Sequence, residues 1–317
     1  MNTTYQDATD FLGSDSNRYF TNGYRHFHWQ VSSFRCDADQ LSGTLTIRYD
    51  GPPRPDGPPH LGSIEYTAIA SMLTEYTLVY LFKLDAEQVS LSMLQQVRMK
   101  LRKSVALEAQ ACLPFRCKLG NPEWTFRASN GILSPITIWL GDVEMALVAD
   151  HPDSRWGRFD PAAVWPLNRP TMYNHGYKLR RNTIADVQCN TSTGTCSAYI
   201  SRQDYYSGDR QGLFSARPAI IPTDVLSVTG QLMQILLYTL ENTTREDCTN
   251  IWLRTMSIRY DRAVWKDCYR ASIRFLDVNT VPMGGGLWRV VELESQLGTI
   301  SGKFTIAHRL KRQNTCE

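Results

Sequence analysis

The chain has 317 residues and a formal net charge of +3, and 42% of its residues are hydrophobic. This length is enough for two ordinary domains, each with a buried core of its own. Basic and acidic residues are mixed along the chain without a block of like charge, which argues against a surface for nucleic acid or membrane. We therefore expect neither as a partner.

The first twenty residues carry acidic and polar side chains where a signal peptide would need a basic start and an apolar stretch. The sequence thus predicts a cytoplasmic protein, in a compartment that disfavours disulfides. The eight cysteines lack the CxxC spacing of a zinc site, as Cys112 and Cys117, or Cys189 and Cys196, illustrate. We expect buried or inert thiols, no bound metal and no cofactor.

Two similar segments follow one another along the chain. Each opens with two strand-like runs around a turn, over residues 25–50 and again over residues 182–204. A proline-containing stretch comes next, and Glu65 and Asp224 each stand six positions after a proline. The chain therefore contains an internal repeat.

A long apolar run accompanies each of these acids, over residues 64–84 and 225–240. Each run is long enough for several helical turns and is apolar on nearly every face, which predicts a buried helix. Glu75, Gln231 and Gln234 interrupt the runs together with the two acids, and this argues against a membrane span.

Beyond each helix the apolar period changes to two, as expected for antiparallel strands with one solvent-facing side. Residues 89–105 fit a strand or a helix equally well. The alternation is clear in the second half and weaker in the first, over residues 136–150, 251–260, 269–275, 287–297 and 302–310.

Each half therefore combines a hairpin, one long buried helix and about three antiparallel strands. This predicts an α+β protein with a tandem (double) hot-dog fold, in which each half is a curved antiparallel sheet wrapped around its helix. The proline-rich stretch 151–177 places the boundary near residue 160. We expect an N-terminal domain over residues 1–160 and a C-terminal domain over residues 161–317.

The two acids at the helix starts are the first candidates for chemistry. A helix N-terminus presents unpaired N–H groups and partial positive charge, which can polarise a thioester carbonyl or hold an enolate oxygen. A carboxylate under apolar side chains there can have a raised pKa and act as a general acid or base. Capping of the helix is an equally good explanation for Glu65 and Asp224.

Four further residues are candidates for the same site. His60, five positions before the first acid, could be a base or proton shuttle, or a loop residue that caps the helix. Arg217 could pair with the second acid, bind an anionic substrate group, or be a solvated surface side chain. Tyr66 and Gln231 lie in the two helical runs and are expected to help bind the substrate.

The segment FLGSDSNRYFTNGYRHFHW resembles the opening of the avirulence D family, and PHLGSIEYTAIA resembles that family's segment at the head of its first long helix. The resemblance implies a biosynthetic enzyme that makes syringolide-type acyl glycosides by joining a β-ketoacyl chain to a five-carbon ketose such as xylulose. It also implies kinship with enzymes that begin γ-butyrolactone signal synthesis by β-ketoacyl transfer to a three-carbon hydroxy ketone.

The segment RPAIIPTD separately resembles the proline-bracketed stretch that leads into the central helix of hot-dog dehydratases and contributes an acid, here Asp224. Many of those enzymes carry a catalytic histidine just before this stretch, where the present chain has Leu213, Phe214 and Arg217. This departure argues against simple dehydration of a hydroxyacyl thioester.

The expected partners are a β-ketoacyl thioester, carried by acyl-carrier protein or coenzyme A, and a ketose or ketose phosphate. The chain is expected to act as a monomer or homodimer, because a double hot-dog completes by itself the pairing that single ones obtain by dimerising. A thioesterase or dehydratase of the same fold is an open alternative, and so is a non-catalytic binder of acyl or lactone signals.

Overall fold

The structure is a computed structural model of the whole chain. It describes residues 2–52, 58–102, 107, 110–120, 123–124, 131–153, 168, 170–204, 212–215, 220–245, 248, 251–261 and 266–310.

The first half of the chain contains three α-helices, two 3-10 helices and eight strands: β1 (Asn2–Asp7), α1 (Thr9–Leu12), η1 (Asp15–Asn17), η2 (Gly23–His26), β2 (Phe27–Cys36), β3 (Gln40–Tyr49), α2 (Ser63–Tyr80), α3 (Ala86–Leu91), β4 (Met93–Lys100), β5 (Gln110–Leu119), β6 (Glu123–Trp124), β7 (Ile132–Leu140) and β8 (Val143–His151) among its described residues. The described residues of the second half form η5 (Gly176–Leu179), β9 (Arg180–Asn190), β10 (Thr195–Asp204), α4 (Pro222–Glu241), β11 (Ile251–Tyr260), β12 (Cys268–Met283), β13 (Gly286–Leu297) and β14 (Ile300–Arg309).

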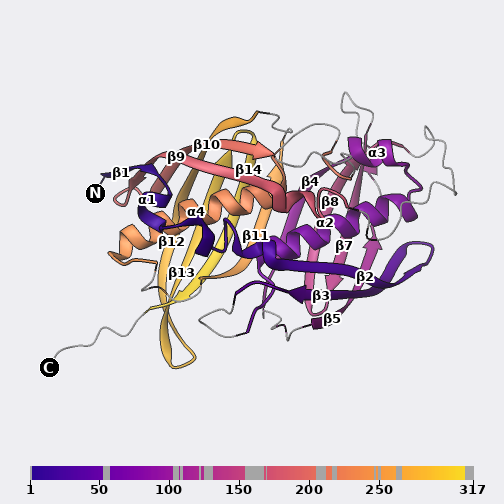
Figure 1. Cartoon of the computed structure of the whole chain (residues 1–317), viewed down its shortest axis with the longest axis horizontal. Helices are drawn as coiled ribbons and strands as arrows, with labels where there is room; N and C mark the ends of the chain where they lie inside the picture. The colour runs from indigo at the N-terminus through magenta and orange to yellow at the C-terminus, as the bar shows by residue number, and fades with distance from the viewer. Residues whose placement is uncertain are drawn as a thin grey trace.

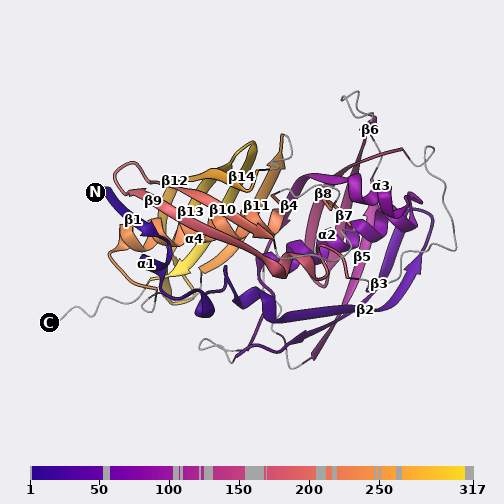
Figure 2. The same ribbon diagram turned by 45° about the horizontal axis from the view of Figure 1, so that its top comes forward.

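These strands form one large antiparallel sheet with the order β1-β9-β10-β12-β13-β14-β11-β4-β8-β7-β5-β3-β2, and β6 pairs with β7. The two halves join where β4 pairs with β11 and places Val97 opposite Ile258. Helix α2 packs against β5 and β7, and α4 packs against β9, β10 and β12 (Figures 1 and 2). The two helices also contact each other, and the end of each helix that lies next to the other is at the centre of the molecule.

Helix α2 is buried on all sides, from Ser63 to Val79. The hydroxyls of Ser71, Thr74 and Thr77 each donate to the carbonyl four residues earlier, at 2.8–2.9 Å. These bonds satisfy polar groups that burial would otherwise leave without a partner. Neither α2 nor α4, nor any other helix in the described ranges, has the length and apolarity needed to cross a membrane.

The segment after α2 differs from the expected single helix over 64–84. Helix α2 ends at Tyr80, and a left-handed residue, Lys83 with φ 59°, separates it from α3. Asp85 and Gln88 then cap α3 reciprocally, each side chain accepting from the other's backbone N–H. Residues 89–105, which fitted either element, supply the end of this short helix and then strand β4.

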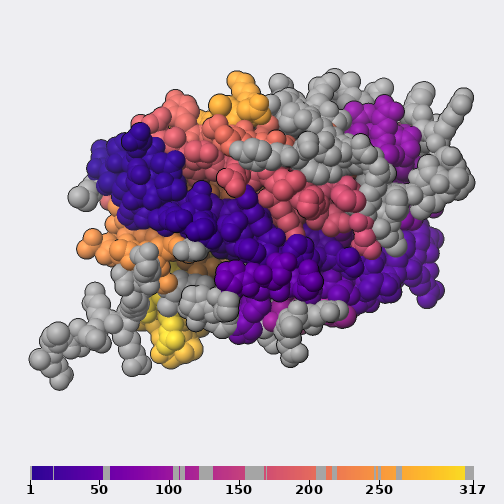
Figure 3. Space-filling model, viewed as in Figure 1, coloured from indigo at the N-terminus to yellow at the C-terminus, as the bar shows by residue number. Residues whose placement is uncertain are grey.

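The N-terminal segment lies on the second half of the molecule. Strand β1 pairs with β9 and places Tyr5 opposite Val187, and Ser227 of α4 donates to the Phe20 carbonyl at 2.7 Å. In Figure 3 the indigo N-terminal residues lie against the salmon and orange residues of the second half. The expected boundary near residue 160 lies outside the described residues, so the division at 160 stays a prediction.

Candidate active site

Glu65 is the third residue of α2, and its side chain is fully buried. Its Oε2 accepts hydrogen bonds from the Gly62 N–H at 2.9 Å and from the Tyr19 hydroxyl at 2.5 Å. The Tyr19 oxygen in turn accepts from the Ile64 N–H at 3.2 Å. A Cβ at position 62 would collide with that hydroxyl, so glycine is required there. The carboxylate thus caps the helix and also shares a short hydrogen bond with a phenol.

Lys178 lies within electrostatic reach of this carboxylate, among aromatic side chains. Its ammonium donates to the Phe27 carbonyl and lies 5.4 Å from the centre of the Trp29 ring. Burial lowers the pKa of Lys178 to about 8, against the opposing effect of the Asp50 and Glu65 carboxylates. An amine with such a pKa can give and take a proton near neutral pH.

Asp224 occupies the equivalent position in α4, at the third residue, and is also buried. Its Oδ2 accepts from the Ile221 N–H at 3.1 Å, which is the same capping bond that Glu65 makes. Arg180 donates to both carboxylate oxygens, through Nε at 3.2 and 3.1 Å and through Nη2 at 2.6 Å. Asn182 adds a bond to Oδ1 at 3.2 Å. The second carboxylate is therefore held by a cation as well as by the helix.

Arg180 is itself buried, and its Nη1 donates to Asp204 at 2.9 Å. Burial disfavours the charged guanidinium, yet the Asp224 and Asp204 carboxylates raise the pKa of Arg180 above its usual range. The Arg180 guanidinium, bound to both oxygens of Asp224, occupies the lone pairs that a general base would use. This geometry suits Asp224 to positioning Arg180 better than to acting as a base.

The sequence reading missed Arg180 and Asn182, although the strand carries a signal for them. Along β9 the core-facing positions include Ile184, and a period of two brings Arg180 and Asn182 onto the same face. An arginine at a core-facing position of a strand is expected to pair with a buried acid, because an unpaired buried charge is costly in free energy.

A second repeat, also missed, joins the two halves. The sequence Gly-Tyr followed by a basic residue occurs at 23–25 and at 176–178, each time in a 3-10 helix that leads into a hairpin. The rings of Tyr24 and Tyr177 stack on each other with centroids 5.8 Å apart and an interplanar angle of 24°.

The basic residues of this repeat make reciprocal bonds. Arg25 donates from Nη2 to the Arg180 carbonyl at 2.8 Å, and Lys178 donates to the Phe27 carbonyl. In each case the acceptor stands two residues after the basic residue of the other half. The two copies of the repeat thus contact each other reciprocally, as parts related by a local twofold axis do.

Glu75 is a fully buried acid in the middle of α2. It accepts from the Thr171 hydroxyl at 2.9 Å and from the Leu213 N–H at 3.0 Å. Burial raises the pKa of Glu75 to about 8, although these two bonds oppose the shift. Gly212, with φ 96°, passes so close that a Cβ there would collide with the Glu75 carboxylate. At neutral pH this side chain carries a proton and can act as an acid.

Tyr173 connects Glu75 to the Asp224 ion pair. Burial raises the pKa of Tyr173 well above its usual value, and the carboxylates of Glu75 and Asp224 act in the same direction while Arg180 opposes them. The pKa of Tyr260 in β11 is also raised well above its usual value, by burial, by Tyr173 and by the Asp224 carboxylate. A buried polar group of residues therefore extends from the middle of α2 to the start of α4. The sequence offered one hint of it, an acid inside an apolar helical run.

Gln231 lies about two turns beyond Asp224 on α4 and is buried. Its Oε1 accepts from Arg18 Nη1 at 3.0 Å, and its Nε2 donates to the Ser227 carbonyl at 3.3 Å. Burial, with a contribution from Arg245, lowers the pKa of Arg18 to about 10. Gln231 thus anchors the N-terminal segment, and its expected contact with substrate stays a prediction.

The other expected site residues are dispersed. The His60 ring stacks on Trp252 of β11, with centroids 5.0 Å apart, so it bridges the two halves. Tyr66 is fully buried in the first turn of α2, next to Glu65. Arg217 lies outside the described residues. The roles of these three residues stay predictions.

A polar groove of about 600 Å³ lies elsewhere, on the second half of the sheet. Ser197 and Ser272 line it, and both alternate along their strands with core residues such as Ala198 and Ala271. The groove therefore opens on the face opposite α4, and the sheet separates it from the helix heads.

These features define an α+β protein with two central helices, a carboxylate at the start of each, and a buried acid and a buried amine nearby. The chain belongs to the family of the Pseudomonas avirulence D protein (AvrD), whose profile matches residues 3–311. The resemblance noted in the sequence is thereby confirmed. No curated protein matches the chain by sequence.

Similar solved structures are distant. An isomerase-inactive variant of GphF DH1 is 12% identical over 92% of this chain and 99% of that chain, with a TM-score of 0.46. An acyl-ACP thioesterase from Bacteroides thetaiotaomicron is 9% identical over 84% and 97%, with a TM-score of 0.41. An acyl-CoA thioesterase II from Mycobacterium marinum is 10% identical over 89% and 96%, with a TM-score of 0.37. These TM-scores lie below 0.5, so the likeness does not define the activity of this chain.

Proposed function

We propose that this protein is a biosynthetic enzyme that joins a β-ketoacyl chain from an acyl thioester to a ketose, giving an acyl glycoside of the syringolide type or a butyrolactone-type precursor. The observation that carries the proposal is the avirulence D family match over residues 3–311. We interpret the two helix-and-strand units as two copies of the hot-dog arrangement, with the division near residue 160. The donor is carried by acyl-carrier protein or coenzyme A, and the acceptor is a free or phosphorylated ketose.

In the proposed reaction a ketose hydroxyl attacks the thioester carbonyl. An oxygen–carbon bond forms, the carbon–sulfur bond breaks, and the carrier leaves as a thiol with the proton. The activated methylene between the two carbonyls of the transferred chain then adds to the ketose carbonyl in an aldol-type condensation. Both steps need a base near the reacting oxygen or carbon and a donor for the developing oxyanion.

Glu65 is our candidate for the base, because its carboxylate is held by a phenol and an amide while Asp224 is bound by a guanidinium. The Tyr19 hydroxyl then serves as the proton relay to the carboxylate. His60 is the alternative base, and Tyr66 is proposed to line the same site. His60 lies a few residues before the start of α2, and Tyr66 lies within its first turn.

In the second half, Asp224 is proposed to hold Arg180 toward the substrate rather than to accept a proton. Gln231 and Arg217 are proposed to contact the sugar or its phosphate. Glu75, which is protonated at neutral pH, is the candidate acid, in the body of α2.

The test is product analysis by mass spectrometry after incubation with a medium-chain β-ketoacyl thioester, with and without xylulose. We expect an adduct that requires the ketose, a loss of about 100-fold or more in Glu65→Gln, and a smaller loss in Asp224→Asn. Glu87→Gln, at an exposed acid of α3, is the matched control. Free β-keto acid without an adduct would indicate a thioesterase instead, and no turnover of any thioester would leave the family's proposed chemistry without support.

A further inference from the structure

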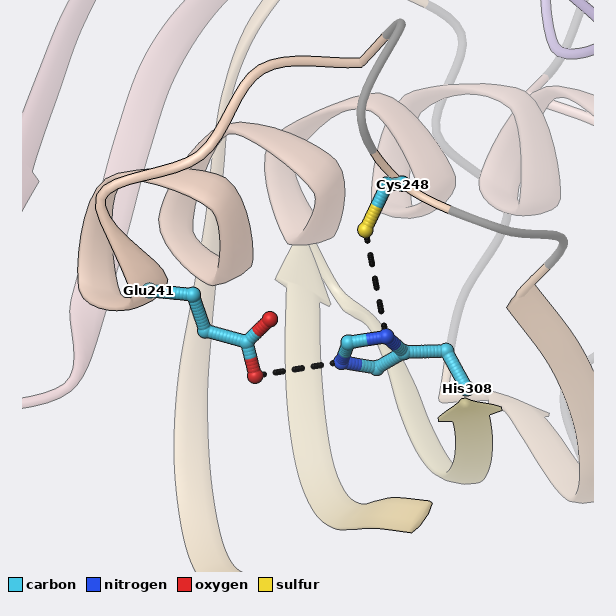
Figure 4. A group of neighbouring side chains, drawn as sticks. All are labelled: Glu241, Cys248 and His308. Atoms are coloured by element: carbon cyan, nitrogen blue, oxygen red, sulfur yellow. Dashed lines mark hydrogen bonds and ion pairs between the residues drawn. The ribbon is translucent and has the colours of Figure 1, made fainter. Parts of the chain in front are cut away.

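Three side chains with reactive groups lie close together at the C-terminal end of α4, the end opposite to Asp224. Glu241 is the last residue of the helix, Cys248 follows it, and His308 projects from β14 (Figure 4). His308 Nε2 lies 3.1 Å from Glu241 Oε1, and His308 Nδ1 lies 3.8 Å from the Cys248 sulfur. No sequence pattern links the three, because 60 positions separate the cysteine from the histidine.

These contacts determine which ring nitrogen of His308 carries the hydrogen. An ionised carboxylate can only accept a hydrogen bond, so the ring hydrogen lies on Nε2 and faces Glu241. Nδ1 then presents its lone pair to the Cys248 thiol. This is the arrangement of a nucleophile, a base and a carboxylate that orients the base.

The surroundings hold the imidazole in place. Arg289 is the cross-strand neighbour of His308 and donates to the same Glu241 oxygen at 2.9 Å. Burial opposes ionisation of Glu241, but His308 and Arg289 lower the pKa of its carboxyl overall. Tyr238 of α4 also faces the thiol: burial, and then Cys248, raise the pKa of that phenol, while Arg245 opposes the shift.

The exposure of the three groups suits a reactive thiol. The His308 side chain is 1% exposed, whereas Cys248 is half-buried and reaches the surface. An imidazole shielded from water keeps its orientation, and a thiol at the edge can meet a large substrate. One ligand atom from each of the three residues lies within 4.8 Å of the others. A metal ion fits less well, however, because Glu241 and Cys248 bond to opposite nitrogens of the ring, whereas a metal ion needs one nitrogen that faces both.

We propose that Cys248 is a nucleophilic thiol, activated by His308 and positioned through Glu241, that takes an acyl group from an acyl thioester. The choice of an acyl thioester rests on the proposed function, whereas the activated thiol does not. The Cys248 proton moves to His308 Nδ1, and the thiolate attacks the thioester carbonyl. The new carbon–sulfur bond forms as the bond to the carrier breaks, and the carrier thiolate takes the proton back from His308. The products are acyl-Cys248 and the carrier thiol.

The first test measures alkylation by iodoacetamide at each cysteine between pH 5 and pH 9, read by peptide mass spectrometry. The exposed Cys36, Cys112 and Cys268 are internal controls in the same chain. We expect Cys248 to react about tenfold faster than these three at pH 6, because the thiolate is the reacting form. Equal rates at pH 6 would overturn the proposal without any need for a variant.

Two variants then assign the partners. His308→Gln is expected to remove the advantage of Cys248 at pH 6. Glu241→Gln is expected to move the pH profile of alkylation toward higher pH while keeping a fast rate at pH 9, as a positioning residue requires. Unchanged pH profiles in both folded variants would contradict the proposed activation. Micromolar zinc that blocks alkylation of Cys248 alone would identify a metal site and overturn the nucleophile.

The second test asks for the acyl group directly. Incubation with the octanoyl thioester of N-acetylcysteamine is expected to leave an octanoyl group on the Cys248 peptide that neutral hydroxylamine removes, and none in Cys248→Ser. Fast alkylation without acylation would overturn the acyl step. Acylation that persists in Glu65→Gln, when the ketose adduct is lost, separates this thiol from the site at the helix heads.

Discussion

The starts of α2 and α4 occupy equivalent places in the two halves, yet their chemistry differs. Both carry an acid at the third helical residue that accepts from the backbone N–H three residues earlier. Glu65 then bonds to a phenol, whereas Asp224 bonds to the forked guanidinium of Arg180. The capping role is therefore common to both copies, and the second partner of each acid is what distinguishes them. A repeated position has kept one structural task and acquired two different chemical environments.

The largest effect is expected from breaking the ion pair of the second half. Arg180→Met leaves the buried Asp224 carboxylate without its cation, and we expect a loss of about 3–5 kcal/mol in the free energy of unfolding. Urea denaturation measures it, with Arg181→Met at the exposed neighbouring position as the control. A loss below about 1 kcal/mol would show that the carboxylate does not depend on this arginine.

The next effect concerns Glu75, in the body of α2. Its pKa in the folded protein is about 8, against 4.5 as its ordinary value. The folded chain thus keeps a proton that the unfolded chain loses, so stability falls as pH rises from about 5 to about 8. We expect a fall of about 2 kcal/mol between pH 5 and pH 7. Glu75→Gln should remove this slope and the exposed Glu292→Gln should retain it, as measured by urea denaturation across that range.

A smaller effect is expected at the start of α2. Tyr19→Phe removes the hydroxyl that bonds to Glu65, which should cost about 1.5 kcal/mol. Tyr199→Phe is the control, since that ring is 57% exposed. If the proton relay is right, Tyr19→Phe also lowers turnover while Tyr199→Phe does not, and a fully active Tyr19→Phe enzyme would remove the phenol from the mechanism.

The smallest effect tests the contact between the halves. Arg25→Met loses the bond to the Arg180 carbonyl, and we expect a loss of about 0.5–1 kcal/mol. Arg35→Met, at an exposed position of β2, should change stability by less than about 0.3 kcal/mol. A loss as large as that of Arg180→Met would mean that the Gly-Tyr repeat, rather than the ion pair, holds the second helix head.

The sequence predicts what depends on local pattern. Hairpins, apolar runs and the two acids are visible because strand alternation, turns and first-turn carboxylates are all encoded within a few residues. The partners of those acids are not local: Tyr19 lies 46 positions from Glu65, and Arg180 lies 44 positions from Asp224. Only the tertiary fold brings them together.

Glu75 is a second example of what the local sequence cannot predict. The sequence shows an acid in an apolar helix, but its pKa depends on complete burial and on Thr171, 96 positions away. The expectation of inert thiols likewise depended on spacing between cysteines. Spacing cannot show that a histidine on another strand faces Cys248.

The pairing of β1 with β9 sets an order of events during synthesis. Residues 2–7 leave the ribosome before their partner residues, 185–190, which are made about 180 positions later. At about 5–20 residues per second, strand β1 waits roughly 9 to 36 seconds for the edge on which it docks. Until then β1 has no place in the sheet, and β9 emerges as an open edge that this much earlier strand must close.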